Sequence, residues 1–416
     1  MNIALFTDCY LPSKNGVVTV VEQLRESLTI LGHHVVVVTV ETIEQKKEES
    51  PDIYRAVSRP IGMGTTDQYF GFPWLPKLIR YLKKNKIEII HTHTEFSIGK
   101  AGIQAAKILN IPVVSTTHTL WEYYYTYYIP MGKMIPIDVI RKFFSNFYKK
   151  TDCIVNVSSK AHDYYKQSFM NPDVPSVIIP NALNPQKFCP ERSPEDKIKA
   201  LRNKLGLEDD NVLLMFVGRI AEEKRVFELL DSVTEAIKRN DKLRAIVVGD
   251  GPALKHLKKL SQSDNINNKI FFTGFIDWRE IHSYYEASDI YMTASLSEMH
   301  SMTILEALIT GLPIVAREDS SFFDTVHHGE NGYLAKDDNE LTEFLLKLAD
   351  DPALRKQFAE KARIISKHYI PDTFVKKHIY LYKTMIALGR KGIPNETEMQ
   401  EIIDKIALDS FSENGE

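Results

Sequence analysis

Two glutamates eight residues apart, Glu298 and Glu306, are well suited to bind polar groups of a ligand. Glu306 falls within a helix predicted over Met302–Thr310, and Leu305 and Leu308 mark the buried face of that helix. An unpaired carboxylate beside a core-facing stripe is costly, so a binding role explains Glu306 better than chance placement. Glu298 precedes the helix, in the loop whose backbone amides open it. A local role for Glu306, as a cap or ion-pair partner, is the structural alternative.

Two cations, Arg219 and Lys224, lie in a predicted strand-to-helix loop after Val212–Val217. A cation near a helix N-terminus opposes the helix dipole, which is unfavourable unless an anion accompanies it. A diphosphate would supply that anion, and each charge pair at ~4 Å contributes about 4 kcal/mol before desolvation. Pairing with Glu222 and Glu223 is the alternative. The combination with Glu298 and Glu306 favours a ligand site.

The segment before residue 120 offers further candidates. Gly16 follows the first strand and opens the first helix, where free backbone amides face an anion. An ordinary strand-to-helix turn is the alternative, and no G-x-G-x-x-G dinucleotide pattern follows. His91 and His93 share one face of an extended segment and could ligate a metal. No third ligand is adjacent, so we expect no metal site.

Short apolar runs that alternate with helical patterns position these residues. Their continuous apolar character indicates strands buried on both faces, which is typical of parallel doubly wound sheets. Gly32 and Gly311 follow two of the helical patterns directly and are natural helix stops. The predicted strands are Ile3–Phe6, His34–Val40, Ile87–Ile90, Val113–Ser115, Ile154–Val157, Val177–Ile179, Val212–Val217, Ala245–Val248, Ile270–Thr273, Ile290–Thr293 and Pro313–Ala316.

A linker at Asn184–Pro194, with three prolines, divides the strands into two series. We therefore predict an α/β protein with two Rossmann-like domains, over residues 1–185 and 186–371. A helix at about 372–390 is expected to pack back on the first domain, and 391–416 to be a polar tail with a short helix. Open sheets of this kind bind ligands at the carboxyl ends of their strands, so we expect one shared site.

The composition excludes several classes of protein. With 44% apolar and 26% charged residues, the chain is neither collagen-like, coiled coil nor disordered, and its net charge of −3 argues against a nucleic-acid binder. Three scattered cysteines match neither a disulfide framework nor a zinc pattern. No apolar run is long enough to span a membrane, and no leader is evident. We expect a cytoplasmic protein.

These residues together resemble a known family. The E-x7-E spacing of Glu298 and Glu306, the G-R-x4-K of Gly218 to Lys224 and the segment Asn181–Phe188 are similar to family 4 of the retaining glycosyltransferases, which have the GT-B fold. The resemblance extends from about Asn2 to Leu388. Within the family it is greatest to bacterial diacylglycerol glucosyltransferases, through the segments Asp8–Val17, His93–Gly99 and Thr117–Tyr124.

The resemblance implies a role for each matching residue. Arg219 and Lys224 would neutralise the donor diphosphate without a metal, Glu306 would bind the ribose, and Glu298 would hold the sugar. His118 would face the reacting centre, so the implied catalytic residues are His118, Glu298, Arg219 and Lys224. The implied nucleotide-sugar site comprises Gly16, Arg219, Lys224, Phe275, Glu298, Met299, His300, Ser301, Met302, Thr303 and Glu306.

Two positions depart from the family pattern. Met299-His300-Ser301 replaces a Gly–aromatic–Gly turn, which leaves the sugar preference open. Ala182 stands where a glycine is usual, a change that a loop tolerates.

An aromatic and basic segment follows His118. Six aromatics fall within Trp121–Tyr128, and Ile140, Phe143, Phe144 and Phe147 have the spacing of an amphipathic helix. Aromatics with flanking cations suit an anionic membrane surface, although a helix packed on its own domain gives the same periodicity. The expected acceptor or membrane residues are Glu95, Trp121, Tyr124, Arg141, Lys142, Phe143, Phe144, Phe147, Lys149 and Lys150.

The charge distribution agrees with a membrane-facing segment. Residues 1–180 hold 20 basic and 16 acidic side chains, and 131–150 alone holds five basic and one acidic, so this stretch carries the whole excess. We therefore expect a retaining, metal-independent transferase of a hexose from UDP-glucose or UDP-galactose to a lipid hydroxyl, that of diacylglycerol. It would lie on the inner face of the cell membrane, bind no nucleic acid, and have an undetermined oligomeric state. The alternatives are a soluble or polyprenyl-linked acceptor, a noncatalytic sugar-nucleotide sensor, and an epimerase.

Overall fold

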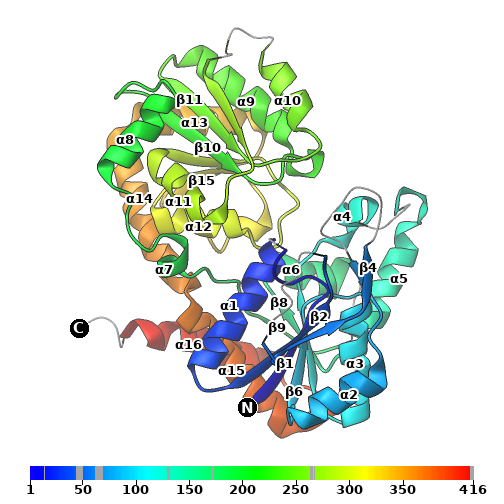
Figure 1. The fold of residues 1–416 in the computed structure, drawn as a ribbon. Helices are drawn as coiled ribbons and strands as arrows, with labels where there is room; N and C mark the ends of the chain where they lie inside the picture. The colour runs from blue at the N-terminus through cyan, green and yellow to red at the C-terminus, as the bar shows by residue number, and fades with distance from the viewer. Residues whose placement is uncertain are drawn as a thin grey trace. The chain divides into compact units, whose positions relative to one another are not determined.

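The apolar runs form two parallel sheets, one in each part of the chain (Figure 1). The computed structural model describes residues 1–13, 15–43, 50–60, 69–128, 132–169, 173–262, 266 and 268–412. They divide into two compact units: unit 1 comprises Met1–Ala182 and Pro371–Glu416, and unit 2 comprises Leu183–Ile370. The predicted fold class, two doubly wound Rossmann-like domains, is confirmed.

The sheet of unit 1 has the strand order β3-β2-β1-β6-β7-β8-β9. Each strand of this sheet runs parallel to its neighbours, and β1 is fully buried from Ile3 to Phe6. The sequence did not reveal β3. The strands are β1 (Asn2–Phe6), β2 (His34–Val40), β3 (Ile53–Ala56), β6 (Ile89–Thr92), β7 (Val113–Thr117), β8 (Cys153–Asn156) and β9 (Ser176–Ile178).

Helices cover both faces of this sheet in Figure 1, and a small antiparallel pair, β4 (Ser58–Pro60) and β5 (Tyr69–Gly71), accompanies them. The helices of unit 1 are α1 (Gly16–Ile30), α2 (Leu75–Lys84), α3 (Ser97–Leu109), α4 (Trp121–Tyr128), α5 (Ile137–Tyr148), α6 (Ser159–Asp163), α15 (Pro371–Leu388) and α16 (Glu396–Ser412), with a π-helix at Tyr164–Phe169.

The sheet of unit 2 has the order β12-β11-β10-β13-β14-β15. Its strands are β10 (Val212–Val217), β11 (Leu243–Val248), β12 (Ile270–Gly274), β13 (Ile290–Thr293), β14 (Ile314–Arg317) and β15 (Gly332–Ala335). Its helices are α7 (Pro185–Phe188), α8 (Glu195–Lys204), α9 (Val226–Arg239), α10 (Leu254–Ser261), α11 (Trp278–Ala287), α12 (Met302–Thr310), α13 (Asp338–Asp350) and α14 (Pro352–Ser366).

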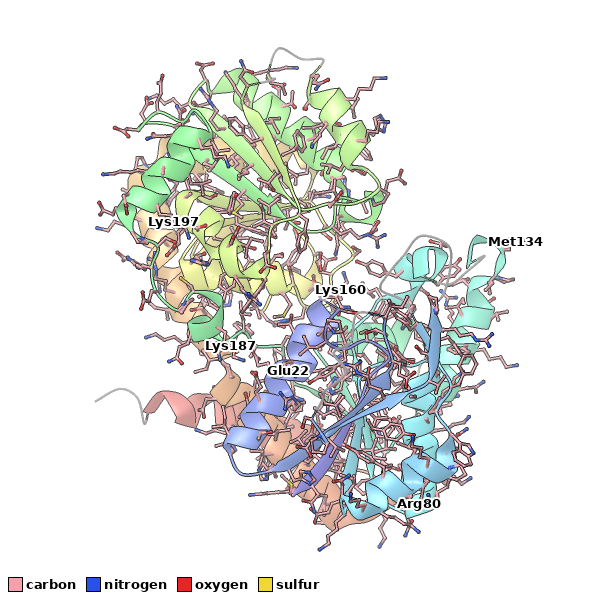
Figure 2. The ribbon with its side chains drawn as sticks, viewed as in Figure 1. Glu22, Arg80, Met134, Lys160, Lys187 and Lys197 are labelled. Carbon is pink, nitrogen blue, oxygen red and sulfur yellow. The ribbon has the colours of Figure 1, made fainter. Side chains whose placement is uncertain are left out.

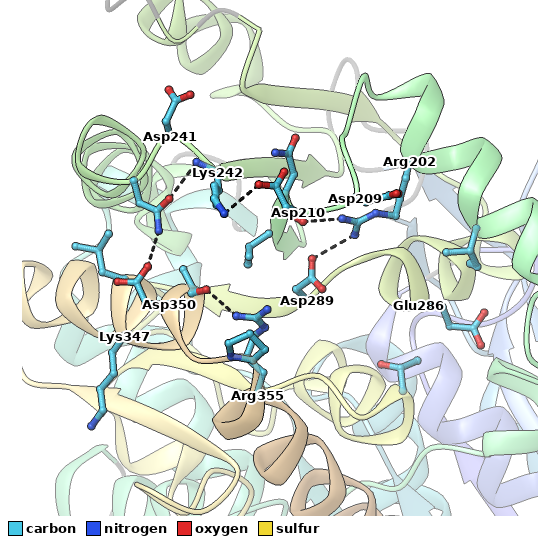
Figure 3. A pocket seen from close by; sticks show the side chains of 18 of the residues that line it. Arg202, Asp209, Asp210, Asp241, Lys242, Glu286, Asp289, Lys347, Asp350 and Arg355 are labelled. Atoms are coloured by element: carbon cyan, nitrogen blue, oxygen red, sulfur yellow. Dashed lines mark hydrogen bonds and ion pairs between the residues drawn. The ribbon is translucent and has the colours of Figure 1, made fainter.

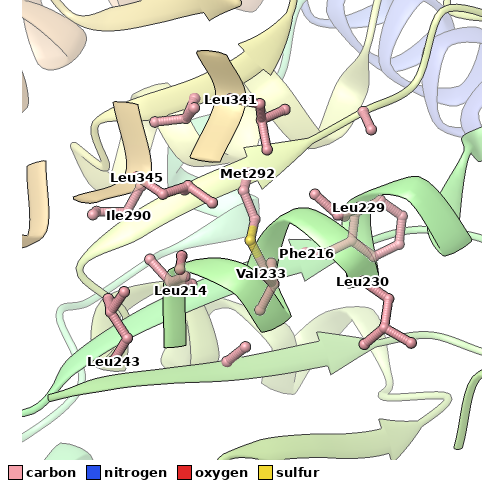
Figure 4. Packing of buried hydrophobic residues seen from close by; sticks show 14 of the residues in the cluster. Leu214, Phe216, Leu229, Leu230, Val233, Leu243, Ile290, Met292, Leu341 and Leu345 are labelled. Atoms are coloured by element: carbon pink, nitrogen blue, oxygen red, sulfur yellow. The ribbon is translucent and has the colours of Figure 1, made fainter. Parts of the chain in front are cut away.

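Strand β10 shows why these strands read as continuous apolar runs. Leu214 and Phe216 face a core formed with α9 and α13, which Figure 4 shows, whereas Leu213 and Met215 face a second core with α11 and α12. Successive side chains of a strand point to opposite faces, so helices on both sides require apolar residues at every position.

The helix that carries Glu306 begins and ends on specific residues. The hydroxyl of Ser301 accepts a hydrogen bond from the backbone N–H of Ile304 and caps the N-terminus of α12. Gly311, at φ +78°, adopts the left-handed conformation that ends this helix, as the sequence predicts. The bounds of α12 therefore follow from local chemistry.

The C-terminal segment returns to unit 1. The hydroxyl of Tyr382 on α15 bonds Nδ1 of the buried His91 on β6 at 2.5 Å, and α16 bonds β9 through the side chain of Gln400. Helix α16 spans 17 residues and replaces the short helix that we expected in the polar tail. The unit boundaries lie between Ala182 and Leu183 and again at Pro371.

In the described ranges, no helix combines the length and the apolar character that a membrane crossing requires.

The bond between Tyr382 and His91 predicts a loss of stability in Tyr382→Phe. The change leaves a buried imidazole nitrogen without its hydroxyl partner, so we expect the free energy of unfolding of unit 1 to fall by about 1 to 3 kcal/mol. Urea unfolding measures this loss. The control is Tyr380→Phe on the same helix, since this tyrosine is partly exposed and its hydroxyl makes no hydrogen bond to the residues that the structure describes. Equal effects of the two changes would contradict the prediction.

Candidate functional site

The candidate donor site of unit 2 lies where β10 and β13 end. These strands are parallel neighbours, with Leu214 paired to Ile290, so the loops that follow them emerge at the same edge of the sheet. The first loop carries Arg219 and Lys224, and the second carries Glu298. Residues about 75 positions apart are thereby brought into contact.

Lys224 and Glu298 form a direct ion pair in this site. Nζ of Lys224 lies 2.5 Å from Oε1 of Glu298, and both side chains are largely covered, with 16% and 20% exposed. Oε1 of Glu298 also accepts a hydrogen bond from the hydroxyl of Ser295 at 3.0 Å. The two groups that the sequence assigns to diphosphate and sugar therefore hold each other in place.

Arg219 is placed differently from Lys224. Its guanidinium is 42% exposed and lies 3.7 Å from Oε1 of Glu223, a side chain that is only 2% exposed. Neither carboxylate oxygen of Glu223 accepts a hydrogen bond from the described residues. The local pairing considered from the sequence thus holds for Arg219, whereas Lys224 reaches the distant Glu298.

A glycine turn that the sequence analysis missed supports the Arg219 loop. Gly249, at φ +136°, lies so close to Gly218 that a Cβ on it would come within 1.9 Å of the Gly218 carbonyl oxygen. The backbone N–H of Ile220 donates to the carbonyl of Asp250 at 2.9 Å. The signal was the Gly249-Asp250-Gly251 run after β11, where only glycine permits so close an approach of two backbones.

Glu306 is buried on α12 and has a local partner. Its side chain is 7% exposed, and Oε2 accepts a hydrogen bond from the hydroxyl of Tyr285 on α11 at 2.6 Å. Burial raises the pKa of Glu306 to about 7, and the Tyr285 hydrogen bond lowers it in part. The burial of Glu306 beside Leu305 and Leu308 is confirmed. Glu306 also has a local partner, which is what the structural alternative requires.

The loop that departs from the family pattern turns its side chains inward. Met299, His300 and Ser301 are all less than 9% exposed, and the ring of His300 lies 5.5 Å from that of Tyr369. Burial lowers the pKa of His300 to about 4, and neither ring nitrogen finds a partner among the described residues. A neutral imidazole ring therefore stands where the family pattern has an aromatic side chain.

The remaining residues assigned to the donor lie at different depths. Met302 is half-buried at the start of α12, and the hydroxyl of Thr303 bonds that of Tyr291 at 2.7 Å. Phe275, which follows β12, is 66% exposed. In unit 1, Gly16 begins α1 and is exposed, next to Asn15, whose side chain accepts from the Val18 N–H and caps this helix.

A cluster in unit 1 joins the ends of β1, β6 and β7. Asp8 accepts hydrogen bonds from the hydroxyls of Thr94 and Ser97 and from the backbone N–H of Ile98. His118 follows β7, and its Nε2 lies 3.1 Å from Nδ1 of His93. Burial lowers the pKa of His118 to about 3, so this imidazole is neutral at physiological pH.

The two histidines considered as metal ligands both bond other side chains. His91 bonds Tyr382 and Thr116, and His93 bonds His118. Over the described ranges, no group of three or more His, Cys, Asp or Glu side chains is arranged to hold a metal ion.

The structure corrects the acceptor assignment for several residues. Glu95 is 4% exposed, and its Oε1 accepts from Nε1 of Trp121 at 3.1 Å and from the hydroxyl of Tyr148 at 2.6 Å. Burial raises the pKa of Glu95 to about 7. Trp121 stacks on Phe144 with 4.5 Å between ring centroids, so these side chains form internal packing. Tyr124 is half-buried on α4, and the side chains of Tyr123, Tyr127 and Tyr128 lie outside the described residues.

Helix α5 is amphipathic, but its apolar stripe faces its own unit. Ile140, Phe144 and Phe147 are all buried, so the prediction that Phe144 and Phe147 contact a membrane was wrong. Periodicity cannot tell which apolar surface a helix covers, and here it is the core of unit 1. Phe143 is partly exposed, with Nζ of Lys100 3.9 Å from its ring centroid.

The cations of α5 also separate into two groups. Arg141 is engaged by the carboxylate of Glu122, with Nε to Oε1 at 2.9 Å, and by Asp138. Lys142, Lys149 and Lys150 are exposed. Lys142 is thus exposed on this helix, and Lys149 and Lys150 are exposed directly after its end.

An exposed aromatic and basic surface on α2 was missed by the sequence analysis. Phe70, Phe72 and Trp74 are 44%, 53% and 68% exposed, and they directly precede α2. That helix presents the exposed cations Lys77, Arg80, Lys83 and Lys84, of which Figure 2 labels Arg80. The signal was the run Phe70-Gly71-Phe72-Pro73-Trp74 before a lysine-rich helix, where aromatics are unusually dense for a surface loop.

A groove of about 1610 Å³ in unit 2 lies away from the proposed chemistry (Figure 3). Its lining includes Asp209–Val212 at the start of β10, whereas Arg219 and Glu298 follow strand ends. Arg202 lines the groove, and its guanidinium bonds the carboxylate of Asp289 at 3.2 Å and the Asn211 carbonyl at 2.6 Å. Cations and carboxylates alternate around the groove, so its charges largely satisfy one another.

The raised pKa of Glu306 predicts a pH-dependent stability. A carboxyl group with a folded-state pKa near 7 and an ordinary value of 4.5 stabilises the fold fully below pH 4.5, and this contribution is lost as the pH rises through 7. The loss amounts to about 3 kcal/mol. We expect Glu306→Gln, which stays neutral and still accepts from Tyr285, to gain stability relative to the wild type between pH 4.5 and 8.

Urea unfolding at the two pH values measures this difference. Glu360→Gln, at an exposed position of α14, is the control and should follow the wild-type profile. If Glu306→Gln also follows it, the buried carboxyl does not titrate as we expect.

Comparison with known proteins follows the same two-unit division. The model of Glycosyltransferase Family 4 matches residues 14–187, and that of Glycosyl transferases group 1 matches 197–364. The alpha-monoglucosyldiacylglycerol synthase of Acholeplasma laidlawii is 31% identical over 396 residues, which cover 94% of this chain and 99% of the relative. That of Streptococcus pneumoniae is 32% identical over 339 residues, covering 80% and 76%.

Solved structures agree on the fold. The sucrose-phosphate synthase of Thermosynechococcus elongatus matches with a TM-score of 0.75 at 21% identity, covering 93% of this chain and 99% of that one. Anabaena HepE in complex with UDP matches with a TM-score of 0.71 at 17% identity, covering 92% and 100%. With a relative of 31% identity that covers 94% of this chain, and with both family models in place, the chain belongs to glycosyltransferase family 4 and is a glycosyltransferase of the GT-B fold.

Proposed function

We propose that this glycosyltransferase moves a hexose, with retention, from a nucleotide diphosphate sugar to the free hydroxyl of diacylglycerol, giving an α-glycosyl lipid. The observation that carries the donor half is the Lys224–Glu298 pair beside Arg219 at the carboxyl end of the unit 2 sheet. The acceptor half rests on the two relatives named as diacylglycerol-modifying synthases. Glucose from a uridine diphosphate is our choice of donor.

The donor site supplies charge where the reaction develops it. Lys224 and Arg219 would bind the diphosphate and stabilise the negative charge that grows on it as the bond to the sugar breaks. Glu298 would then accept hydrogen bonds from the sugar hydroxyls, and Glu306 from the ribose hydroxyls, through their carboxylate oxygens. These cations make a metal unnecessary for charge stabilisation in this proposal.

The transfer would occur on one face of the sugar. The acceptor hydroxyl oxygen forms a bond to the anomeric carbon as the bond from that carbon to the diphosphate oxygen breaks. The bonding electrons leave with the diphosphate, and the hydroxyl proton passes to a phosphate oxygen. Attack from the side that the leaving group vacates retains the configuration, so no covalent enzyme intermediate is needed.

The surface of unit 1 supports a membrane-bound acceptor. The exposed lysines on and directly after α5, together with the aromatics before α2 and the cations on it, combine two kinds of side chain that favour the headgroup region of an anionic bilayer. Each cation near such a surface contributes about 1 kcal/mol of attraction. We therefore place the enzyme on the inner face of the cell membrane, bound peripherally.

Lys224→Ala tests the donor assignment. Loss of a preorganised cation at the leaving group should lower kcat by roughly 100- to 1000-fold. The measurement is transfer of a radiolabelled hexose from its uridine diphosphate to diacylglycerol in mixed vesicles, with Lys255→Ala on the exposed face of α10 as the control. Turnover of Lys224→Ala near the wild-type level would remove Lys224 from the diphosphate site.

Charge reversal of the two lysines that directly follow α5 tests the membrane assignment. Lys149→Glu combined with Lys150→Glu replaces attraction by repulsion, so we expect binding to vesicles rich in phosphatidylglycerol to weaken at least tenfold at low salt. Flotation of the protein with vesicles measures this binding. The matched control is Lys258→Glu with Lys259→Glu, an adjacent exposed pair in the last turn of α10. Equal flotation of both double variants would contradict a docking role for α5.

A further inference from the structure

Four histidines lie together in unit 1, and one of them is the residue assigned to the reacting centre. The ring centroids of His91 and His93 are 4.1 Å apart, those of His93 and His118 are 5.4 Å apart, and that of His378 lies 5.7 Å from that of His91. Three of the four are almost completely buried, with His118 partly exposed. The arrangement makes His93 the link between the core and His118.

Both members of the His93–His118 pair are neutral imidazoles. Burial lowers the pKa of each, and the neighbouring histidines lower that of His93 further. A neutral imidazole carries one ring proton, so it has one donor nitrogen and one acceptor nitrogen. Nδ1 of His93 and Nε2 of His118, 3.1 Å apart, therefore share a single proton.

Two arrangements satisfy this contact, and they differ at the outer nitrogens. If Nε2 of His118 donates, His93 must carry its own proton on Nε2. That nitrogen is buried and has no partner among the described residues. If instead Nδ1 of His93 donates, its Nε2 is an unprotonated nitrogen and the proton of His118 is on Nδ1.

The surroundings of His93 favour the second arrangement. Its neighbour His91 cannot accept from it, because both of its ring nitrogens bond hydroxyls, those of Tyr382 and Thr116. Nδ1 of His378 donates to the carbonyl of Phe374 at 2.9 Å, and although this leaves Nε2 of His378 as an acceptor, Nε2 of His93 makes no hydrogen bond to it. A buried N–H without an acceptor is among the rarest defects of folded proteins, and the second arrangement avoids it.

We propose that His93 is a positioning residue that donates its Nδ1–H to Nε2 of His118 and so holds His118 as a neutral hydrogen-bond donor through Nδ1–H. This inference rests on the proposed function and on the role that the family resemblance implies for His118, which is to face the reacting centre. Nδ1 of His118 makes no hydrogen bond within the described part of the chain. Its ligand is an oxygen lone pair, of a hexose hydroxyl or of the diphosphate.

This tautomer excludes His118 as the general base of the reaction. With its available nitrogen already protonated, His118 cannot accept the proton of the acceptor hydroxyl. It contributes a directed hydrogen bond to an oxygen of the donor. This agrees with a reaction in which a phosphate oxygen takes that proton.

The ring protons of the wild-type enzyme can be observed directly. Full-length protein labelled with ¹⁵N-histidine gives a two-bond ¹H–¹⁵N pattern that distinguishes the two tautomers, and the His118 signals are those missing in His118→Gln. We expect protonated Nδ1 and unprotonated Nε2 at pH 7. The opposite tautomer, or a doubly protonated ring, would overturn the proposal whether or not the enzyme is active.

A pair of isosteric variants tests the same point by kinetics. His93→Asn keeps an amide N–H near the place of Nδ1–H, whereas His93→Asp presents a carboxylate that accepts from Nε2–H of His118 and reverses its tautomer. We expect kcat/KM for the sugar nucleotide to stay near wild type in His93→Asn and to fall roughly 10- to 100-fold in His93→Asp. Thermal unfolding of both variants checks that each is folded.

The outcomes separate the proposal from the proposed function. Equal kcat/KM values in the two folded variants would overturn the role of His93. Loss of folding in His93→Asp would leave the spectrum of the wild type as the deciding measurement. A wild-type enzyme that transfers no hexose from any sugar nucleotide would overturn the proposed function, and the tautomer of His118 would still be read from its spectrum.

Discussion

The burial of parallel strands between helices is the constraint on which the rest of this structure depends. A strand covered on both faces favours apolar residues, as in β10 from Val212 to Val217, so the charged groups of the candidate site lie where strands end. Because parallel strands all end at one edge, the loops after β10, β11 and β13 meet there, and the same rule gathers the loops after β1, β6 and β7 in unit 1.

Charged and polar groups at these edges stabilise one another. Lys224 and Glu298 form a close pair, and Glu306 is held by a tyrosine hydroxyl. Such pairing reduces the cost of keeping charge in a partly covered site. If Lys224 binds a diphosphate as we propose, the diphosphate would replace Glu298 as the partner of Lys224.

The two units differ in how they hold their polar residues. In unit 2 the central contact joins opposite charges, whereas in unit 1 a chain of neutral groups runs from Tyr382 through His91 and His93 to His118. Neutral groups cost less to bury than ions, which explains why histidines can be packed so deeply there. Hydrogen-bond geometry then fixes which ring nitrogen carries each proton. A fixed N–H is what His118 needs if it orients a sugar as we propose.

Local chemistry in the sequence determined the strands that are continuously apolar, the bounds of α12 between Ser301 and Gly311, and the resemblance carried by Glu298, Glu306, Arg219 and Lys224. A short, partly exposed element such as β3 depends on neighbours that no local pattern encodes. The Gly249 turn has a local glycine signal, but its close approach to Gly218 is set by the pairing of β10 with β11. Periodicity established that α5 has an apolar stripe, and only the tertiary structure decided that Phe144 and Phe147 face the core. The sequence likewise supplied His93 and His118, and tertiary packing decided that they share one proton. The physical reason is the same in both cases. The spacing of residues shows which of them share an apolar or a polar face of one element, whereas contacts between distant segments depend on how those faces pack together.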